Sequence, residues 1–142
     1  IDGYFDYVTP PLEGFWALPG SDGFDPARKA EFRWISAIRL PDFVSREDLE
    51  WAVRTATDKK KRDFSAAEFL TVREGLCVQM LHVGPFDDEP ESVARMDAFV
   101  SANGYANDFT ESRLHHEIYL SDFRKTAPEK RKTVLRHPIR RA

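Results

Sequence analysis

Strand-like and helix-like segments follow one another in a fixed order through the second half of the chain. Residues 76–83 form a short, mostly apolar run of strand length after the Glu74-Gly75 turn signal, and Gly84-Pro85 ends the segment. From 88 to 104 the apolar spacing is that of an amphipathic helix. Polar and apolar residues alternate at 115–122, and a closing strand is predicted at 133–139. The chain from residue 76 onward is therefore predicted to be a strand, a helix and two strands.

Helix-start signals precede two segments. Ser45 is followed three residues later by Asp48, and Asp88 by Glu91, which is the capping-box spacing in both cases. Pro90 lies in the first turn of the second helix, where its missing N–H costs nothing. We therefore predict one helix after Ser45, linking the two halves of the chain, and a second helix after Asp88.

Short strand-like segments make up much of the first half. Aromatic and β-branched residues are frequent in 4–9, 12–18 and 31–40, and prolines lie at their ends. A fourth segment, 67–73, is followed by Glu74-Gly75, a turn signal that predicts a hairpin with the strand that comes next. The predicted fold class is therefore α+β.

The composition indicates one soluble globular domain over residues 1–142. Hydrophobic residues make up 42% of the chain, and no apolar run approaches the roughly 18 residues that span a bilayer. The net charge of −3 gives no electrostatic reason for nucleic-acid binding. Cys77 is the single cysteine, so no disulfide framework is expected, and a reducing cytoplasm fits best. The chain begins at Ile1 rather than Met, which leaves room for a missing N-terminal portion.

Glu117 is the residue in the predicted strand 115–122 that needs an explanation. In an extended segment His115, Glu117 and Tyr119 share one face, and the other face is apolar at Ile118. Glu117 is then either an ordinary residue on a wet face or a carboxylate enclosed by aromatic rings. Enclosure would raise the pKa of the carboxyl group, which could accept a proton from water or balance a ligand's positive charge.

Aromatic residues make up 13% of the chain and offer candidates for a ligand-binding surface. Tyr7, Trp16 and Trp34 lie on predicted strands of the first half, where they either fill the core or stack on a planar or cationic ligand. Met80 is either an adaptable wall of a pocket or core filler. The residues alone leave both alternatives open.

No metal, cofactor or nucleophile motif is apparent. His82, His115 and His116 invite a zinc hypothesis, but adjacent residues of a strand point to opposite faces and the spacing fixes no third ligand. Cys77 has no evident neighbouring base, and there is no nucleophile-elbow serine, phosphate loop or dinucleotide fingerprint. We therefore expect neither a bound metal nor a cofactor.

Three stretches of the sequence carry a family resemblance. They are YFDYVTPPLEGFW, QMLHVGPFDDEPES and HHEIYLSDFRKTAPEKRKTVLRHP, in this order and at these distances. Together they resemble the GyrI-like small-molecule-binding proteins, particularly the stand-alone branch that includes cyclopropanoid hydrolases. The similarity extends over nearly the whole chain.

The resemblance implies two pseudo-symmetric strand-helix-strand-strand modules that form one curved antiparallel sheet, with helices on one face and a ligand cleft between the modules. Residues 1–40 would be the rest of the first module, 41–74 a linking helix and strand, and 75–142 the second module. Family members carry a further strand and helix before the first of these segments, so these elements are expected to be absent here or trimmed. The family's important glutamate, in the penultimate strand, matches Glu117.

The resemblance also implies a function. The expected ligands are bulky, hydrophobic and aromatic small molecules, often cationic, with no nucleic-acid or membrane partner and a monomer or weak dimer as the assembly. Glu117 would activate water to hydrolyse strained electrophiles such as cyclopropanoids, with help from Tyr119. Alternatively, the same residues form a multidrug-binding or cation-binding module without chemistry. The expected ligand-binding residues are Tyr7, Trp16, Trp34, Met80 and His115.

Overall fold

The computed structural model describes residues 2–17 and 26–142. The chain divides into two compact units, one formed by Ile1–Thr9 and Arg39–Val72 and the other by Pro10–Ile38 and Arg73–Ala142. The larger unit contains the sheet and the second helix, and the smaller unit contains the first helix. Within the described residues no helix is both long enough and apolar enough to cross a membrane.

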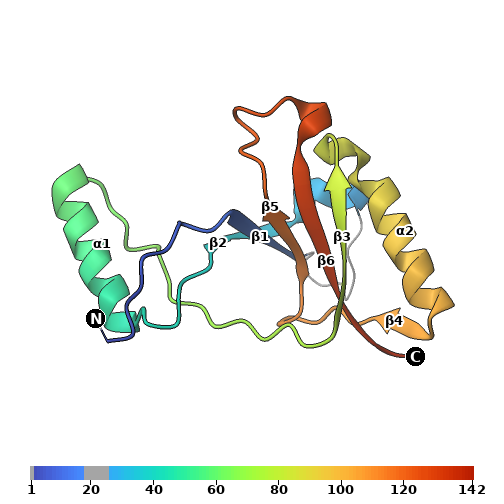
Figure 1. The fold of residues 1–142 in the computed structure, drawn as a ribbon, viewed down its shortest axis with the longest axis horizontal. Coiled ribbons are helices and arrows are strands. Elements are labelled where there is room, and N and C mark those ends of the chain that lie inside the picture. The colour runs from blue at the N-terminus through green and yellow to red at the C-terminus, as the bar shows by residue number, and fades with distance from the viewer. Residues whose placement is uncertain (1, 18–25) are drawn as a thin grey trace. The chain divides into compact units, whose positions relative to one another are not determined.

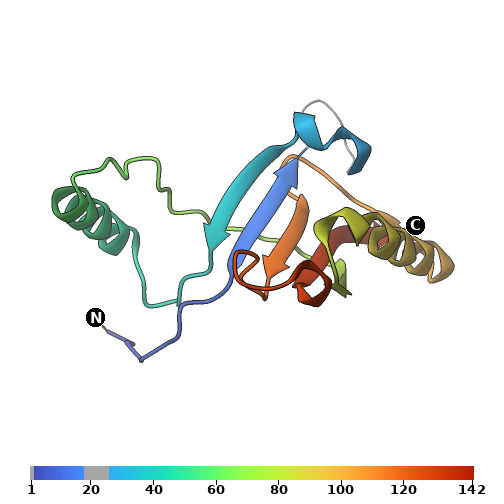
Figure 2. The same cartoon turned by 90° about the horizontal axis from the view of Figure 1, so that it is seen from above.

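A six-stranded antiparallel sheet forms the larger unit (Figure 1). Five strands lie in the order β2, β1, β5, β6, β3, and β4 pairs with the end of β6. Figure 2 shows β2, β1 and β5 side by side in cyan, blue and orange. The strands are β1 (Leu12–Ala17), β2 (Arg33–Ile38), β3 (Cys77–Val83), β4 (Tyr105–Asn107), β5 (His115–Tyr119) and β6 (Lys132–Arg141). Two strands from the first half of the chain are thus joined to strands from its last quarter.

Helix α2 (Glu89–Ala102) packs against β3 and β4 (Figure 1). Val93 and Met96 on the helix meet Leu135 of β6, which is fully buried, and the partly buried Val78 and Met80 of β3 complete the cluster. The apolar stripe expected for this helix is therefore what attaches it to the sheet. The connections that the structure describes contain three short 3-10 turns: η1 (Pro26–Glu31), η2 (Phe86–Asp88) and η3 (Pro128–Lys130).

The smaller unit contains α1 (Arg46–Lys60) and an aromatic cluster. Ser45 caps the helix, and the reciprocal hydrogen bonds between Ser45 and Asp48 form the expected capping box. The cluster is held by edge-to-face and tilted ring contacts around Phe43, and its other members are Tyr4, Phe5 and Tyr7.

The α+β class, both helices and five of the strands are confirmed. The predicted strands at 4–9 and 67–73 are wrong, and with them the hairpin at Glu74-Gly75: both segments are irregular in the structure. A strand needs a partner for its backbone groups, and strand propensity alone supplies none. The capping box at Asp88–Glu91 is also wrong, because the Asp88 side chain makes no capping hydrogen bond. β4 was not predicted, and the module boundaries stay predictions.

Candidate functional site

Glu117 lies near the middle of the sheet on β5 and is only 5% exposed. One carboxylate oxygen, Oε1, is 2.8 Å from His115 Nε2, and the other, Oε2, accepts a 2.7 Å hydrogen bond from the Tyr119 hydroxyl. The alternation of the strand places these three side chains on one face, as expected. Both oxygens of a buried carboxylate are therefore held by neighbours on the same strand.

The pKa of Glu117 is lowered, not raised as the sequence suggested. Burial is the largest influence and raises the pKa, but several groups outweigh it together: the hydrogen bond and charge of His115, and the hydrogen bonds with Tyr119 and Glu89. The burial of Glu117 was predicted, but the hydrogen-bond donors that stabilise its ionised form were not. Glu117 is therefore an ionised carboxylate at neutral pH.

Tyr119 remains a protonated phenol beside this carboxylate. Burial, the charge of Glu117 and the hydrogen bond to Glu117 all raise its pKa, in that order. Its hydroxyl donates to Glu117 and accepts a 3.3 Å hydrogen bond from the Trp16 indole N–H. A chain of donors thus runs from Trp16 through Tyr119 to Glu117.

Trp16 and Trp34 meet above a glycine. Gly14 pairs with Glu117 in the β1–β5 ladder, and Trp16 pairs with Trp34 in the β1–β2 ladder, with ring centroids 5.8 Å apart. A Cβ on Gly14 would lie 2.4 Å from Trp34 Nε1, 2.8 Å from the Tyr119 oxygen and 3.0 Å from Trp16 Nε1. The missing side chain therefore allows three polar atoms to converge beside Glu117. Trp34 is 48% exposed, which gives this group one face open to solvent.

A second acidic residue, Glu89, belongs to the site and was missed. It is the first residue of α2, is 8% exposed and hydrogen-bonds to the Glu117 side chain. A hydrogen bond between two carboxyl groups requires that one of them carry a proton. The residue sits in the QMLHVGPFDDEPES stretch, but its burial depends on how the helix docks on the sheet.

The remaining predicted ligand-binding residues lie in different surroundings. Tyr7 belongs to the aromatic cluster of the smaller unit. Met80 packs against the buried cluster under α2. His115 is 1% exposed, and its two ring nitrogens face Glu117 and His137. The structure therefore brings Trp16 and Trp34 to Gly14, the ladder partner of Glu117, from β1 and β2, and places the His115 ring against the carboxylate.

The other face of β5 carries a separate ionic group around His116. His116 Nε2 is 2.7 Å from Glu13 Oε2, and its Nδ1 is 2.5 Å from Glu74 Oε1. The ring stacks on Phe15 at a centroid distance of 4.1 Å, and Arg136 binds Glu74 at 2.6 Å. This face, expected to be apolar, thus has a polar centre.

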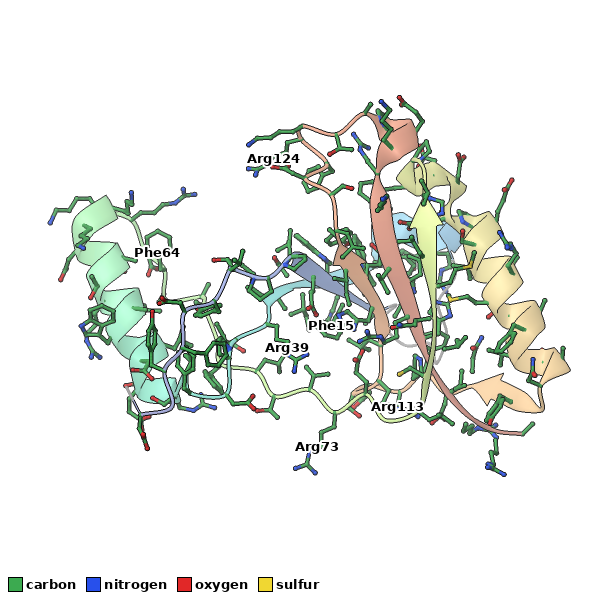
Figure 3. The ribbon with its side chains drawn as sticks, viewed as in Figure 1. Phe15, Arg39, Phe64, Arg73, Arg113 and Arg124 are labelled. Carbon is green, nitrogen blue, oxygen red and sulfur yellow. The ribbon has the colours of Figure 1, made fainter. Side chains whose placement is uncertain are left out.

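Arg113 holds the chain segment that leads into β3 (Figure 3). Its guanidinium donates to the carbonyls of Glu74 and Leu76 and pairs with Asp108. Glu74 is therefore placed by Arg113 as well as by the His116 group. This segment replaces the predicted hairpin turn at Glu74-Gly75.

The histidines of the zinc hypothesis have separate partners. His82 bonds to Ser92 and to the Pro85 carbonyl, while His115 and His116 point to opposite faces. Among the residues that the structure describes, no three His, Cys, Asp or Glu side chains are grouped so as to hold a metal ion.

Comparisons with known proteins place these features in a family. The family profile described as a GyrI-like small molecule binding domain matches residues 45–140. The solved structure of an uncharacterized conserved protein from Listeria innocua is 50% identical with a TM-score of 0.89; the match covers 98% of this chain and 68% of that one. A search of curated proteins found no match.

Two structures named as hydrolases, also from Listeria innocua, are similar as well. They are 46% and 48% identical, both with a TM-score of 0.85; each match covers 98% of this chain, and 66% and 67% of theirs. The chain thus spans about two thirds of the length of these proteins. With a family profile over more than half of its residues, the chain belongs to the GyrI-like small-molecule-binding family.

Proposed function

We propose that this protein is a hydrolase for bulky, planar, electrophilic small molecules with a strained ring, such as cyclopropanoids, and that Glu117 is the base that accepts a proton from the attacking water. The observation that carries the proposal is an ionised carboxylate, 5% exposed, that accepts a hydrogen bond from the Tyr119 phenol, which in turn accepts one from the Trp16 indole. The hydrolase names of two similar structures support the reaction class.

The proposed reaction is the addition of water across a ring bond. The water oxygen forms a bond to a ring carbon, the strained carbon–carbon bond breaks, and its electron pair enters the conjugated system, which takes up a proton. Glu117 accepts a proton from the water, and general-base help of this kind contributes roughly a hundred- to ten-thousand-fold. A lowered pKa makes Glu117 a weaker base that is nevertheless ionised throughout the neutral range. Ring strain in the substrate compensates for that weakness.

The aromatic side chains would hold the body of the substrate. Trp34 presents an exposed indole, and Trp16 lies against it. Each ring contact with a planar or cationic ligand contributes on the order of 1 kcal/mol. Met80 is part of the proposal as a further wall of the cleft implied by the family, and the ligand-binding role of Tyr7 stays a prediction from the sequence. His115 has its role behind Glu117, because its ring is 1% exposed.

A second candidate function is a binding module for hydrophobic cations that performs no chemistry. The observation that favours it is the same ionised carboxylate beside indole rings, which is a suitable counter-charge for an aromatic cation. In that case affinity follows the charge of the ligand rather than its reactivity. Either function would take place in the cytoplasm, require no cofactor and protect the cell from toxic small molecules.

Ring opening in labelled water tests the first proposal. The protein is incubated with an electrophilic cyclopropane compound in H₂¹⁸O, and the product is followed by mass spectrometry. We expect one ¹⁸O atom per opened ring with the wild type and a loss of at least a hundredfold in rate with Glu117→Gln. Glu91→Gln is the control, because Glu91 is exposed on α2. Equal rates for wild type and Glu117→Gln would contradict the proposal.

Matched ligands test the second candidate. A cationic aromatic ligand and a neutral ligand of the same shape are titrated against the wild type and against Glu117→Gln. If Glu117 is a counter-charge, the cation binds more tightly than the neutral ligand, and Glu117→Gln removes the difference. Equal affinity of the two ligands for the wild type would contradict the binding module.

A further inference from the structure

His137 is a buried titratable residue that the mechanism above does not use. It lies on β6, next to β5 in the sheet, and is 1% exposed. Its ring is in edge-to-face contact with Phe109 at 4.9 Å and with His115 at 4.8 Å between centroids. No route for a ligand to this ring is evident at such burial, so any role in the reaction must act through a neighbour.

That neighbour is His115, which stands between His137 and the candidate base. His137 Nε2 is 2.6 Å from His115 Nδ1, and His115 Nε2 is 2.8 Å from Glu117 Oε1. Both distances are those of hydrogen bonds. The three side chains therefore form a continuous line across two adjacent strands.

His137 is a neutral imidazole, which can either donate a hydrogen bond to His115 or accept one from it. Burial and, second, the charge of His115 lower its pKa to about 3, so the ring is neutral at neutral pH. A neutral imidazole has one donor and one acceptor nitrogen. When neutral His115 donates to Glu117 through Nε2, its Nδ1 accepts from His137. When His115 is protonated on both nitrogens, its Nδ1 donates and His137 accepts.

We infer that His137 is a positioning residue that holds the His115 ring with Nε2 against Glu117, so that the proton taken from the attacking water is shared between Glu117 and His115. The proton leaves the water oxygen and binds to Glu117. It then passes along the 2.8 Å contact to His115 Nε2 when His115 is in the neutral tautomer that carries its own proton on Nδ1 and donates it to His137, because only then is Nε2 an acceptor. The inference rests on the proposed function. It adds to that function a proton acceptor made of two residues, Glu117 and His115. A third residue, His137 on the neighbouring strand β6, sets their geometry.

Two substitutions separate positioning from simple core packing. In His137→Leu the side chain fills much of the space but offers His115 no hydrogen bond. In His137→Gln the amide can present either its oxygen or its NH₂ group and so can replace both forms of the imidazole. Positioning requires that Gln rescue what Leu loses, whereas a packing role predicts the opposite order or no difference.

The first measurement needs no substrate. Protein labelled with ¹⁵N in its four histidines is titrated, and the ring nitrogens of His115 are followed by NMR. We expect His137→Leu to change the tautomer or titration of His115 and His137→Gln to leave it close to the wild type. An unchanged His115 spectrum in folded His137→Leu would overturn the inference, whatever the protein hydrolyses.

The second measurement uses the ring-opening reaction. We expect kcat to fall by about tenfold or more in His137→Leu, the size of loss typical of a partner that orients a functional histidine, with KM within twofold of the wild type. His137→Gln should recover most of kcat. Equal kcat values for both variants and the wild type would overturn the inference. Loss of activity in Glu117→Gln, measured in parallel, reports on the proposed function separately.

Discussion

Gly14 and Glu117 face each other across the β1–β5 ladder, and the side chain that Gly14 lacks is what admits Trp34 and Tyr119 to the carboxylate. Gly14→Ala would place a methyl group 2.4 Å from Trp34 Nε1 and 2.8 Å from the Tyr119 oxygen. We expect a loss of at least tenfold in ring-opening rate or ligand affinity. The free energy of unfolding should fall by only about 1–2 kcal/mol, because the half-exposed indole can move aside.

Gly104→Ala is the matched control for Gly14→Ala. Gly104 has a φ of +76° and no atom within 4 Å of an added Cβ, so the substitution introduces backbone strain without crowding. It should cost about 1 kcal/mol of stability and leave the activity unchanged. Equal effects of the two substitutions on activity would show that the space above Gly14 has no special role.

Tyr119→Phe removes the hydroxyl that donates to Glu117 and accepts from Trp16. A hydrogen bond to a charged group contributes about 1.5–3 kcal/mol, so we expect a loss of roughly 10- to 100-fold in rate. The hydrogen bond is also one of the influences that lower the pKa of Glu117. The acid limb of the pH–rate profile should therefore move to higher pH. Tyr105→Phe, on β4, is the control, and an acid limb that moves to lower pH would contradict the assignment.

Glu89→Gln and Glu89→Ala distinguish a hydrogen bond from a charge at the start of α2. Gln can still donate to Glu117, whereas Ala leaves the carboxylate without this partner. We expect the rate with Gln to stay within about threefold of the wild type and the rate with Ala to fall by at least tenfold. Glu91→Ala removes an exposed carboxylate from the same helical turn and should leave the rate at the wild-type value. If Gln is as inactive as Ala, Glu89 supplies a proton rather than a hydrogen bond.

The alternation of polar and apolar residues predicted the part of the site that lies on strand β5. The alternation from His115 to Tyr119 placed both residues and Glu117 on one face, and the structure has them there. His115 and Tyr119, which lower the pKa of Glu117, lie on the same strand, and Glu89 comes from α2. The position of Glu89 depends on how the helix docks on the sheet, which local spacing does not encode. The direction of the pKa shift was wrong because burial was considered without the hydrogen bonds that these three residues make to the carboxylate.

Two segments that were predicted to be strands are irregular, because strand formation also depends on contacts that are distant in the sequence. Residues 4–9 and 67–73 have the aromatic and β-branched content of strands, and neither is a strand in the structure. In 4–9 the rings instead contact Phe43. Propensity describes what fits a pleated surface, and it becomes a strand only where a neighbouring strand supplies the hydrogen bonds.

The depressed pKa of His137 makes the stability of the fold depend on pH. The pKa is about 3 in the folded protein and 6.5 ordinarily, so between these values the unfolded chain binds more protons than the folded chain. The contribution is fully present above pH 6.5 and is lost as the pH falls toward 3. His137→Gln should make the fall in unfolding free energy shallower by up to about 1.4 kcal/mol per pH unit. Urea unfolding between pH 4 and 7 measures the difference, and parallel curves for the two proteins would contradict it.

The group around His116 should stabilise the fold without affecting the chemistry. His116→Leu leaves Glu13 and Glu74 without their imidazole partner, although Arg136 still binds Glu74. Breaking a fully buried pair costs about 3–5 kcal/mol, and the partial exposure of both carboxylates reduces the expected loss to about 2–3 kcal/mol in urea unfolding. The rate per folded molecule should stay within twofold of the wild type, because His116 lies on the face opposite Glu117.

Two further substitutions test whether the stability lost in His116→Leu is due to the carboxylates that lose their imidazole partner. Adding Glu13→Gln and Glu74→Gln to His116→Leu removes both carboxylates that lose their imidazole partner, while Arg136 keeps its hydrogen bonds to Gln79. We expect part of the lost unfolding free energy to return, because a neutral amide costs less to bury than a carboxylate. If the triple variant is less stable than His116→Leu alone, the stacking of His116 on Phe15, rather than its ion pairs, stabilises this face of the sheet.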